Sequence, residues 1–276
     1  MVDVTWLTDR LASGRAPVLA DVRWYLDGRS GRDAYENGHL PGAVFVDLDR
    51  ALAAEPGPAV GRHPLPVPEE FAEAMSAVGI GDDTTVIAYD DADGVVAARL
   101  VWMLRATGHD AALLDGGLGA WPGPLDTGPA TTEPAHLTPR PWPSELLADV
   151  DATADAAATG TAVVVDARDA DRYRGDREPV DPRAGHIPGA RSVPVRGNVG
   201  PDGTFLPVEE LRARFAEAGI TGAADVISYC GSGVNACHNL IALEHAGLGV
   251  GRLFPGSWSQ YSSDPARPAA TGDAPG

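Results

Sequence analysis

The stretch Val226-Ile-Ser-Tyr-Cys-Gly-Ser-Gly-Val-Asn235 decides the fold. Its first four residues predict a short buried strand, its two glycines predict a tight loop, and the residues from Asn235 onward predict a helix. The glycines allow successive backbone N–H groups to turn inward, and the helix adds partial positive charge at its N-terminus. Both features favour negative charge on a sulfur, so we predict that Cys230 is a nucleophile rather than a small buried apolar residue.

The chain repeats its own motifs in the same order. Val18-Leu-Ala-Asp-Val-Arg23 recurs as Val163-Val-Val-Asp-Ala-Arg168, and Gly38-His-Leu-Pro-Gly-Ala43 recurs as Gly185-His-Ile-Pro-Gly-Ala190. Farther along each copy, Val86-Ile-Ala-Tyr-Asp90 matches Val226-Ile-Ser-Tyr-Cys230. Such self-similarity indicates a duplicated domain.

The duplication sets the predicted domain organisation. Residues 1–122 form the first domain, the stretch 123–145, rich in Pro, Gly and Thr, is a linker, and residues 146–276 form the second domain. Residues 264–276 are rich in Pro, Ala and Gly, and we expect them to be frayed. Because strands and helices alternate in each copy, we predict an α/β fold of two tandem domains, each a mostly parallel sheet flanked by helices.

Charge and cysteine content exclude several classes of protein. With 21 Lys and Arg against 39 Asp and Glu, the net charge of -18 argues against binding to nucleic acid or to an anionic membrane. The sequence has no signal peptide or long apolar stretch, so we expect a cytoplasmic protein. Its two cysteines, Cys230 and Cys237, cannot form a disulfide framework or an all-thiol zinc site, and we expect Cys237 to pack.

The repeat serves as an internal control, because residues present in both copies are expected to serve the fold. His39 and His186 occupy the same turn in each copy, so we assign both a structural role. Cys230, in contrast, is replaced by Asp90 in the first copy, where acidic side chains would repel an anion. We therefore expect an inactive first domain and a catalytic second domain.

These motifs resemble the rhodanese family, specifically its tandem two-domain sulfurtransferases, over nearly the whole chain. The matching features are the Asp-x-Arg motifs, the Gly-His-x-Pro-Gly-Ala turns, the Cys230 loop and the late Pro255-Gly-Ser-Trp258. The resemblance implies two rhodanese-like domains that move sulfane sulfur from thiosulfate or 3-mercaptopyruvate through a Cys230 persulfide. The acceptor would be cyanide or a thiol, such as that of a thioredoxin-like protein, and no metal or organic cofactor is implied.

The resemblance also implies roles for particular residues. The loop would cup the outer sulfur of the persulfide through the backbone of Gly231, Gly233, Val234 and Asn235. Mercaptopyruvate enzymes of the family use a Ser-His-Asp set, which falls here on Ser232, His63 and Asp49. A serine, a neutral histidine and an orienting carboxylate are suited to proton transfer near pH 7.

An anionic donor needs positive partners, and the family's first arginine falls on Arg172. A guanidinium can hold a carboxylate or sulfonate through two hydrogen bonds. The second arginine of the mercaptopyruvate enzymes is missing, because Glu178-Pro179 is followed by Val180. Arg177 and Arg174, both nearby in the sequence, are the candidates to replace it, and the alternative is that each is a solvated loop charge.

Other readings of the cysteine loop are open. A cysteine phosphatase would need an arginine where Ala236 stands, and a redox pair of Cys230 and Cys237 lacks the Cys-x-x-Cys spacing. The main alternative to the enzyme is a persulfide carrier or regulatory rhodanese module that serves a protein partner. Turnover of small molecules discriminates between the two.

Overall fold

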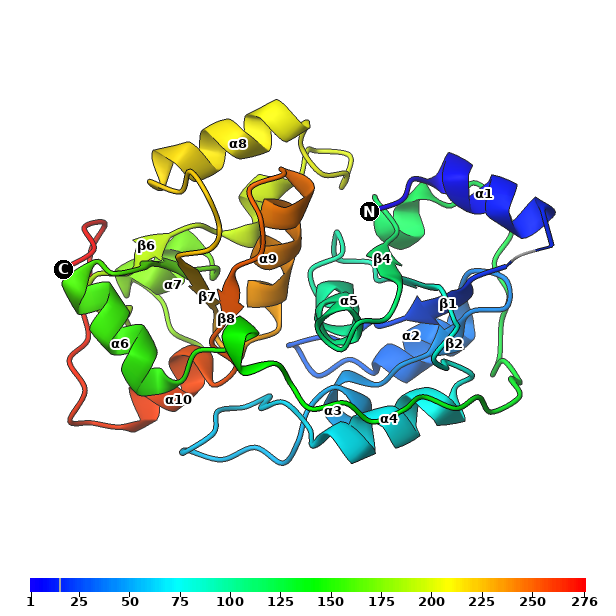
Figure 1. The fold of residues 1–276 in the computed structure, drawn as a ribbon, viewed down its shortest axis with the longest axis horizontal. Coiled ribbons are helices and arrows are strands. Elements are labelled where there is room, and N and C mark those ends of the chain that lie inside the picture. Colours follow the sequence, from blue (N-terminus) through cyan, green and yellow to red (C-terminus); the bar gives the residue numbers. More distant parts are fainter. Residues whose placement is uncertain (15) are drawn as a thin grey trace. The chain divides into compact units, whose positions relative to one another are not determined.

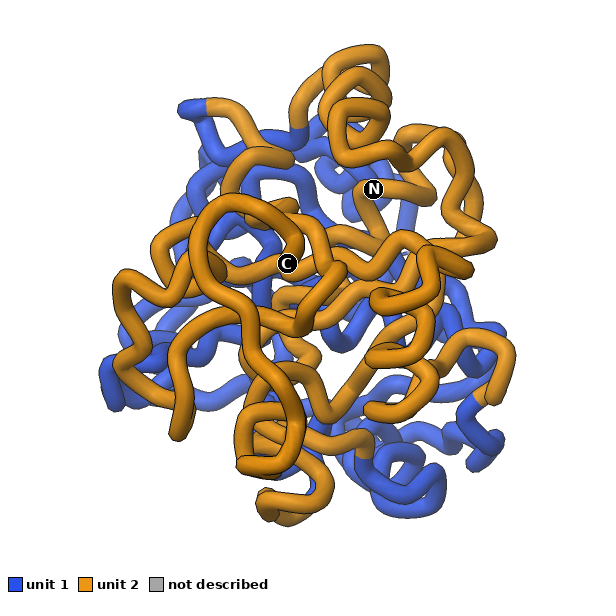
Figure 2. The backbone as a smooth tube through the Cα atoms, turned by 90° about the vertical axis from the view of Figure 1, so that its left-hand side faces the viewer, with its two compact units in different colours: residues 1–54, 66–142, 201–205 blue, residues 55–65, 143–200, 206–276 orange. Residues whose placement is uncertain are grey.

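The computed structural model describes residues 1–14 and 16–276 as two compact units, each built on a four-stranded sheet (Figures 1 and 2). Unit 1 comprises Met1–Ala54, Pro66–Trp142 and Pro201–Phe205, and unit 2 comprises Glu55–Leu65, Pro143–Gly200 and Leu206–Gly276. The strand order is β2-β1-β3-β4 in unit 1 and β6-β5-β7-β8 in unit 2, with parallel pairing throughout both orders. The predicted α/β fold of two parallel sheets is confirmed.

Unit 1 alternates short strands with helices, as its sequence predicts. Its strands are β1 (Val18–Asp21), β2 (Val44–Phe45), β3 (Val86–Tyr89) and β4 (Ala111–Leu113). Its helices are α1 (Val4–Ala12), α2 (Gly31–Asn37), α3 (Leu48–Ala51), α4 (Pro68–Ala77), α5 (Ala97–Ala106) and the 3₁₀ helix η1 (Gly117–Ala120). Helix α5 packs against β3 and β4.

Unit 2 follows the same plan. Its strands are β5 (Val163–Asp166), β6 (Arg191–Ser192), β7 (Val226–Tyr229) and β8 (Arg252–Leu253). Its helices are η2 (Ser144–Leu146), α6 (Val150–Thr159), α7 (Ala170–Arg174), η3 (Val195–Asn198), α8 (Val208–Glu217), α9 (Asn235–His245) and α10 (Ser257–Ser263). Within residues 1–14 and 16–276, no helix is long and apolar enough to cross a membrane.

The repeated Asp-x-Arg motif forms a buried ion pair at the carboxyl end of β1 in unit 1 and of β5 in unit 2. In unit 1 the Arg23 guanidinium lies 2.7 Å from the Asp21 carboxylate, and it also donates to the Gly38 carbonyl. Unit 2 repeats this arrangement with Asp166, Arg168 and Gly185. The pair thus joins the end of a strand to the Gly-His-x-Pro-Gly-Ala turn, which explains why the two motifs occur together.

The repeated histidines are also part of the fold. His39 stacks on Tyr35, and its Nδ1 lies 2.9 Å from the Tyr35 carbonyl. His186 stacks on Tyr173 in the same way. Both histidines are buried, and the structural role predicted for them is confirmed.

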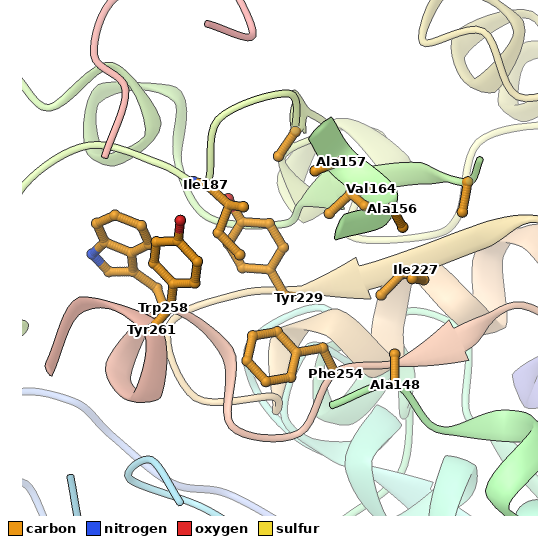
Figure 3. Packing of buried hydrophobic residues seen from close by; sticks show 12 residues of the cluster. Ala148, Ala156, Ala157, Val164, Ile187, Ile227, Tyr229, Phe254, Trp258 and Tyr261 are labelled. Atoms are coloured by element: carbon orange, nitrogen blue, oxygen red, sulfur yellow. The ribbon is translucent and has the colours of Figure 1, made fainter. Parts of the chain in front are cut away.

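The core of unit 2 includes Tyr229, the residue that directly precedes Cys230. Figure 3 shows Tyr229, Phe254, Trp258 and Tyr261 grouped in this core, all of them buried. The Trp258 and Tyr261 rings stack with their centroids 5.6 Å apart. Trp258 and Tyr261 are therefore packing residues that support the end of β7 and the start of α10.

The compact units differ from the predicted boundaries, because the predicted linker 123–145 falls within them, up to Trp142 in unit 1 and from Pro143 in unit 2, and because two further segments change sides. Residues 55–65 contact unit 2, and residues 201–205 contact unit 1. The boundaries 1–122, 123–145 and 146–276 stay a prediction about the duplicated modules.

The C-terminal segment 264–276, which we expected to be frayed, bonds back to unit 2. His186 and Ala270 form a two-way backbone bridge, and Gly189 donates to the Pro275 carbonyl. Arg183 donates to the carbonyls of Asp264 and Arg267. These bonds do not fit the expectation of a frayed end, because they hold the backbone of the segment against the body of the unit.

The buried ion pair makes a prediction about stability. Asp21→Ala should lower the free energy of unfolding of unit 1 by about 3–5 kcal/mol, since it leaves the buried Arg23 charge uncompensated. Asp27→Ala is the control, because the Asp27–Arg29 pair is exposed and should matter little. Urea unfolding followed by circular dichroism measures both. Equal losses for the two variants would contradict the role given to the Asp21–Arg23 pair.

Candidate active site

Cys230 lies at the carboxyl end of β7, in the loop that leads into α9. Its sulfur accepts hydrogen bonds from the backbone N–H groups of Ser232, at 3.4 Å, and Gly233, at 3.1 Å. The thiol is buried, with 2% of the residue exposed. The loop thus directs backbone donors at a sulfur, the geometry that stabilises negative charge there.

Gly233 is required by the shape of this loop. Its backbone has φ +79°, and a Cβ at this position would lie 2.5 Å from the Pro255 carbonyl oxygen. Both the conformation and the close approach exclude a side chain. Val234 follows as a buried residue, and Asn235 is the first residue of α9. The part predicted for these two residues in holding the outer sulfur stays a prediction.

The start of α10 supports the loop from the opposite side. The N–H groups of Trp258 and Ser259 donate to the carbonyls of Cys230 and Gly231. Ser257, which adopts φ +53°, accepts a hydrogen bond from the Cys230 N–H through its hydroxyl and donates to the Phe254 carbonyl. Positive φ is uncommon outside glycine, so this bonding fixes an unusual turn at the site.

A hydrogen bond joins Ser232 to His63. The Ser232 Oγ and the His63 Nδ1 are 2.7 Å apart, and each residue is 7% exposed. His63 lies in the segment Glu55–Leu65, which belongs by its contacts to unit 2 although the sequence on both sides belongs to unit 1. The structure therefore brings together two of the three residues predicted for proton transfer.

This segment is held by α10. The Arg62 N–H donates to the Ser259 hydroxyl at 3.0 Å, and the Gln260 amide donates to the Ala59 carbonyl at 2.6 Å. Gly61, at φ +89°, approaches so closely that a Cβ would lie 2.5 Å from the Gly256 carbonyl oxygen. One short helix thus positions both the cysteine loop and the histidine segment.

Asp49, the third residue of the predicted set, lies in unit 1 on α3. Its carboxylate accepts a hydrogen bond from the Trp24 indole N–H at 3.0 Å, and its own N–H donates to Asp47. Its role in orienting His63 stays a prediction.

Arg172 lies at the site, within a network of carboxylates. Its guanidinium donates to Glu178 at 2.6 Å and to Asp181 at 2.9 Å. Burial acts to raise the pKa of Glu178, but hydrogen bonds from Arg172 and the backbone outweigh it and leave that pKa lowered. Burial raises the pKa of Asp181, although Arg62 and Arg172 act in the opposite direction. The pKa values of the two carboxylates are thus shifted in opposite directions, that of Asp181 upward and that of Glu178 downward.

The structure gives no support to Arg177 or Arg174 as the second donor-binding arginine. Arg177 pairs with Asp171 at 2.7 Å, and its side chain is 54% exposed. Arg174 pairs with Asp176 on the surface. Both arginines are close to Val180 in sequence, but the guanidinium of each pairs with a nearby carboxylate, Asp171 or Asp176.

Arg62, which the sequence motifs did not single out, also lies beside the cysteine loop. A Cβ on Gly231 would lie 2.8 Å from the Arg62 Nη2 and 3.4 Å from the Arg172 Nη1, so both guanidinium groups reach the residue next to Cys230. A signal was present in the sequence, since Arg62 directly precedes His63, for which the second copy has no counterpart.

Cys237 packs, as expected. It is fully buried within α9, and its thiol donates to the Gly233 carbonyl at 3.3 Å. This contact stabilises the cysteine loop.

Asp90 occupies the corresponding loop of unit 1. Its carboxylate accepts four backbone hydrogen bonds of 2.8 Å, two on each oxygen. The donors are the N–H groups of Ala92, Gly94, Val96 and Ala97. The loop of unit 1 therefore holds the chain's own carboxylate where unit 2 holds a thiol.

Comparison with known proteins agrees with this geometry. The pattern of the Rhodanese-like domain matches residues 3–123 and 149–264. The chain belongs to the rhodanese family. It is 44% identical over 265 residues to the "Probable 3-mercaptopyruvate sulfurtransferase" of Pseudomonas aeruginosa, with 93% of each chain covered.

Two further relatives place the chain within the family. SseB of Mycobacterium tuberculosis, whose name refers to thiosulfate sulfurtransferase, is 40% identical and covers 99% of this chain and 98% of its own. The crystal structure of SseA from Escherichia coli superposes with a TM-score of 0.82 at 33% identity, covering 94% of this chain and 98% of that one. The chain is a sulfurtransferase with two rhodanese domains.

The close approach of Gly233 to the Pro255 carbonyl can be tested by adding a side chain. Gly233→Ala should reduce sulfur transfer by about 10²-fold, because displacing the loop moves the N–H donors away from the reacting sulfur. Gly160→Ala is the matched control, since Gly160 has φ +69° with open space around it and lies at the end of α6. It should cost only the backbone strain of about 1–2 kcal/mol and leave activity intact. Activity retained in Gly233→Ala would contradict the account of the loop.

Proposed function

We propose that this sulfurtransferase carries sulfane sulfur as a persulfide on Cys230 and passes it to cyanide or to a thiol. The supporting observation is the pair of backbone N–H groups, from Ser232 and Gly233, directed at the Cys230 sulfur. Such donors stabilise a thiolate before the reaction and a persulfide anion after it.

The donor that the site favours is 3-mercaptopyruvate. The Cys230 thiolate attacks the donor's sulfur, a sulfur–sulfur bond forms, and the carbon–sulfur bond breaks with its electron pair on carbon. The proton of the donor's thiol ends on that carbon, which gives pyruvate and an anionic persulfide. Ser232 and His63, hydrogen-bonded at 2.7 Å, are suited to move this proton.

Thiosulfate is the second candidate donor. Attack on its outer sulfur breaks the sulfur–sulfur bond of the donor and releases sulfite, and no proton has to move. The two guanidinium groups beside Gly231 favour a doubly charged anion. In the second half-reaction cyanide attacks the outer sulfur of the persulfide, which releases thiocyanate and regenerates the Cys230 thiolate.

The two donors respond differently to loss of the proton-transfer pair. His63→Ala and Ser232→Ala should each lower kcat/KM for 3-mercaptopyruvate by about 10²-fold and affect thiosulfate much less, because only the first donor needs the proton moved. Ser232→Ala keeps its backbone N–H, so the donors to the sulfur stay in place. Steady-state assays with cyanide as acceptor measure both ratios.

The Cys230→Ser protein is the blank for these assays and should show no turnover. Activity in this variant would contradict the persulfide role of Cys230. Equal losses for the two donors in His63→Ala would make His63 a structural residue.

A further inference from the structure

Two guanidinium groups converge on one point beside the nucleophile. Gly231 has no side chain, and the place where a Cβ would stand is 2.8 Å from Arg62 Nη2, 3.4 Å from Arg172 Nη1 and 3.7 Å from Arg172 Nη2. Arg62 comes from the segment Glu55–Leu65 and Arg172 comes from α7, and both belong to unit 2. Two arginines from distant parts of the sequence thus face the residue that follows Cys230.

A carboxylate of the protein already bridges these two arginines. One oxygen of Asp181 accepts from Arg62 Nη1, and the other accepts from Arg172 Nη2 at 2.9 Å. The Asp181 side chain is 1% exposed. Each oxygen therefore has a guanidinium of its own, which is the arrangement expected for a bound carboxylate or sulfonate ligand.

The charges of this cluster cancel while Asp181 is in place. Arg62 and Arg172 carry two positive charges, and Asp181 and Glu178 carry two negative ones. An entering anion would then find little net attraction. One of the two carboxylates therefore has to move away from the arginines before they can bind the donor.

Asp181 is the carboxylate that can move away, because fewer groups hold it than hold Glu178. Glu178 is held by Arg168 and by the N–H groups of Val180 and Asp181 in addition to Arg172. Among the described residues, the hydrogen bonds to the Asp181 carboxylate all come from Arg62 and Arg172. A pocket of about 180 Å³ adjoins it, lined in part by Val180, Pro182 and Ser259, and offers room for its side chain.

We propose that Arg62 and Arg172 form the subsite for the carboxylate or sulfonate of the sulfur donor, and that Asp181 occupies this subsite until the donor displaces it. This inference rests on the proposed function and adds to it a specificity residue, Arg62, and an internal competitor, Asp181. It also accounts for the arginine that is missing at Val180, because Arg62 supplies the second guanidinium from another part of the chain.

If Arg62 binds the donor and Asp181 competes with it, substitutions of the two residues should change KM in opposite directions. Asp181→Asn keeps the size of the side chain and removes its charge, so it should lower KM for both donors about tenfold or less. Arg62→Ala should raise KM for both donors by about 10- to 100-fold, the loss expected for a charged hydrogen bond. Arg62→Lys, which retains the charge without the planar fork, should give a value between those of wild type and Arg62→Ala.

The control is Arg196→Ala, which removes an exposed arginine of the same unit, 71% exposed and 3.6 Å from Asp169. It should leave KM unchanged. Steady-state rates with 3-mercaptopyruvate and with thiosulfate, cyanide being the acceptor, decide which anionic group the subsite prefers. An unchanged KM in Arg62→Ala, or a raised KM in Asp181→Asn, would overturn the proposal.

Binding without turnover separates this inference from the proposed function. Calorimetric titration of the Cys230→Ser protein with thiosulfate should show tighter binding when Asp181→Asn is added and weaker binding when Arg62→Ala is added. If the wild type turns over neither donor, the proposed function fails while this titration still tests the subsite. Equal affinity in all three proteins would overturn the subsite itself.

Discussion

In each sheet, the loop after the third strand in chain order directs backbone N–H groups inward, and these groups need an acceptor. Buried N–H groups without a partner are costly. In unit 1 the acceptor is the carboxylate of Asp90, with four donors on its two oxygens. In unit 2 it is the sulfur of Cys230. The same loop architecture thus holds a carboxylate in the first copy and a thiol in the second.

The short helix α10 connects this loop to the rest of the proposed site. Its first N–H groups hold the carbonyls of Cys230 and Gly231, and Ser259 and Gln260 hold the segment that carries Arg62 and His63. Displacement of α10 would therefore move Cys230, His63 and Arg62 together. Trp258 and Tyr261 of this helix belong to the core cluster of unit 2, which links the packing of the unit to the proposed site.

Much of the fold could be predicted from the sequence, because it is encoded locally. The run Val226-Ile-Ser-Tyr229 forms β7 with the bounds that its pattern predicts, and the Gly-His-x-Pro-Gly-Ala turns carry the buried histidines. Ser232 and His63 were predicted from the family resemblance, and they do form a hydrogen bond. The C-terminal segment was misjudged because composition does not reveal backbone bonds to distant residues such as His186.

Arg62, Asp181 and the serines of α10 escaped prediction for a similar reason. Their contacts join residues far apart in the sequence, such as Arg62 with Ser259 and Ser257 with Cys230, and no local pattern specifies such contacts. Arg177 was named only for its closeness in sequence to Val180; it pairs with Asp171, and its role at the site stays a prediction.

The most direct test of the central claim is mass spectrometry of the intact protein and of its Cys230 peptide after exposure to a sulfur donor without an acceptor. The account predicts the addition of one sulfur atom, located on Cys230, and its removal when cyanide is added. An unmodified Cys230, or sulfur located on Cys237 instead, would contradict the claim that the N–H groups of this loop hold a persulfide.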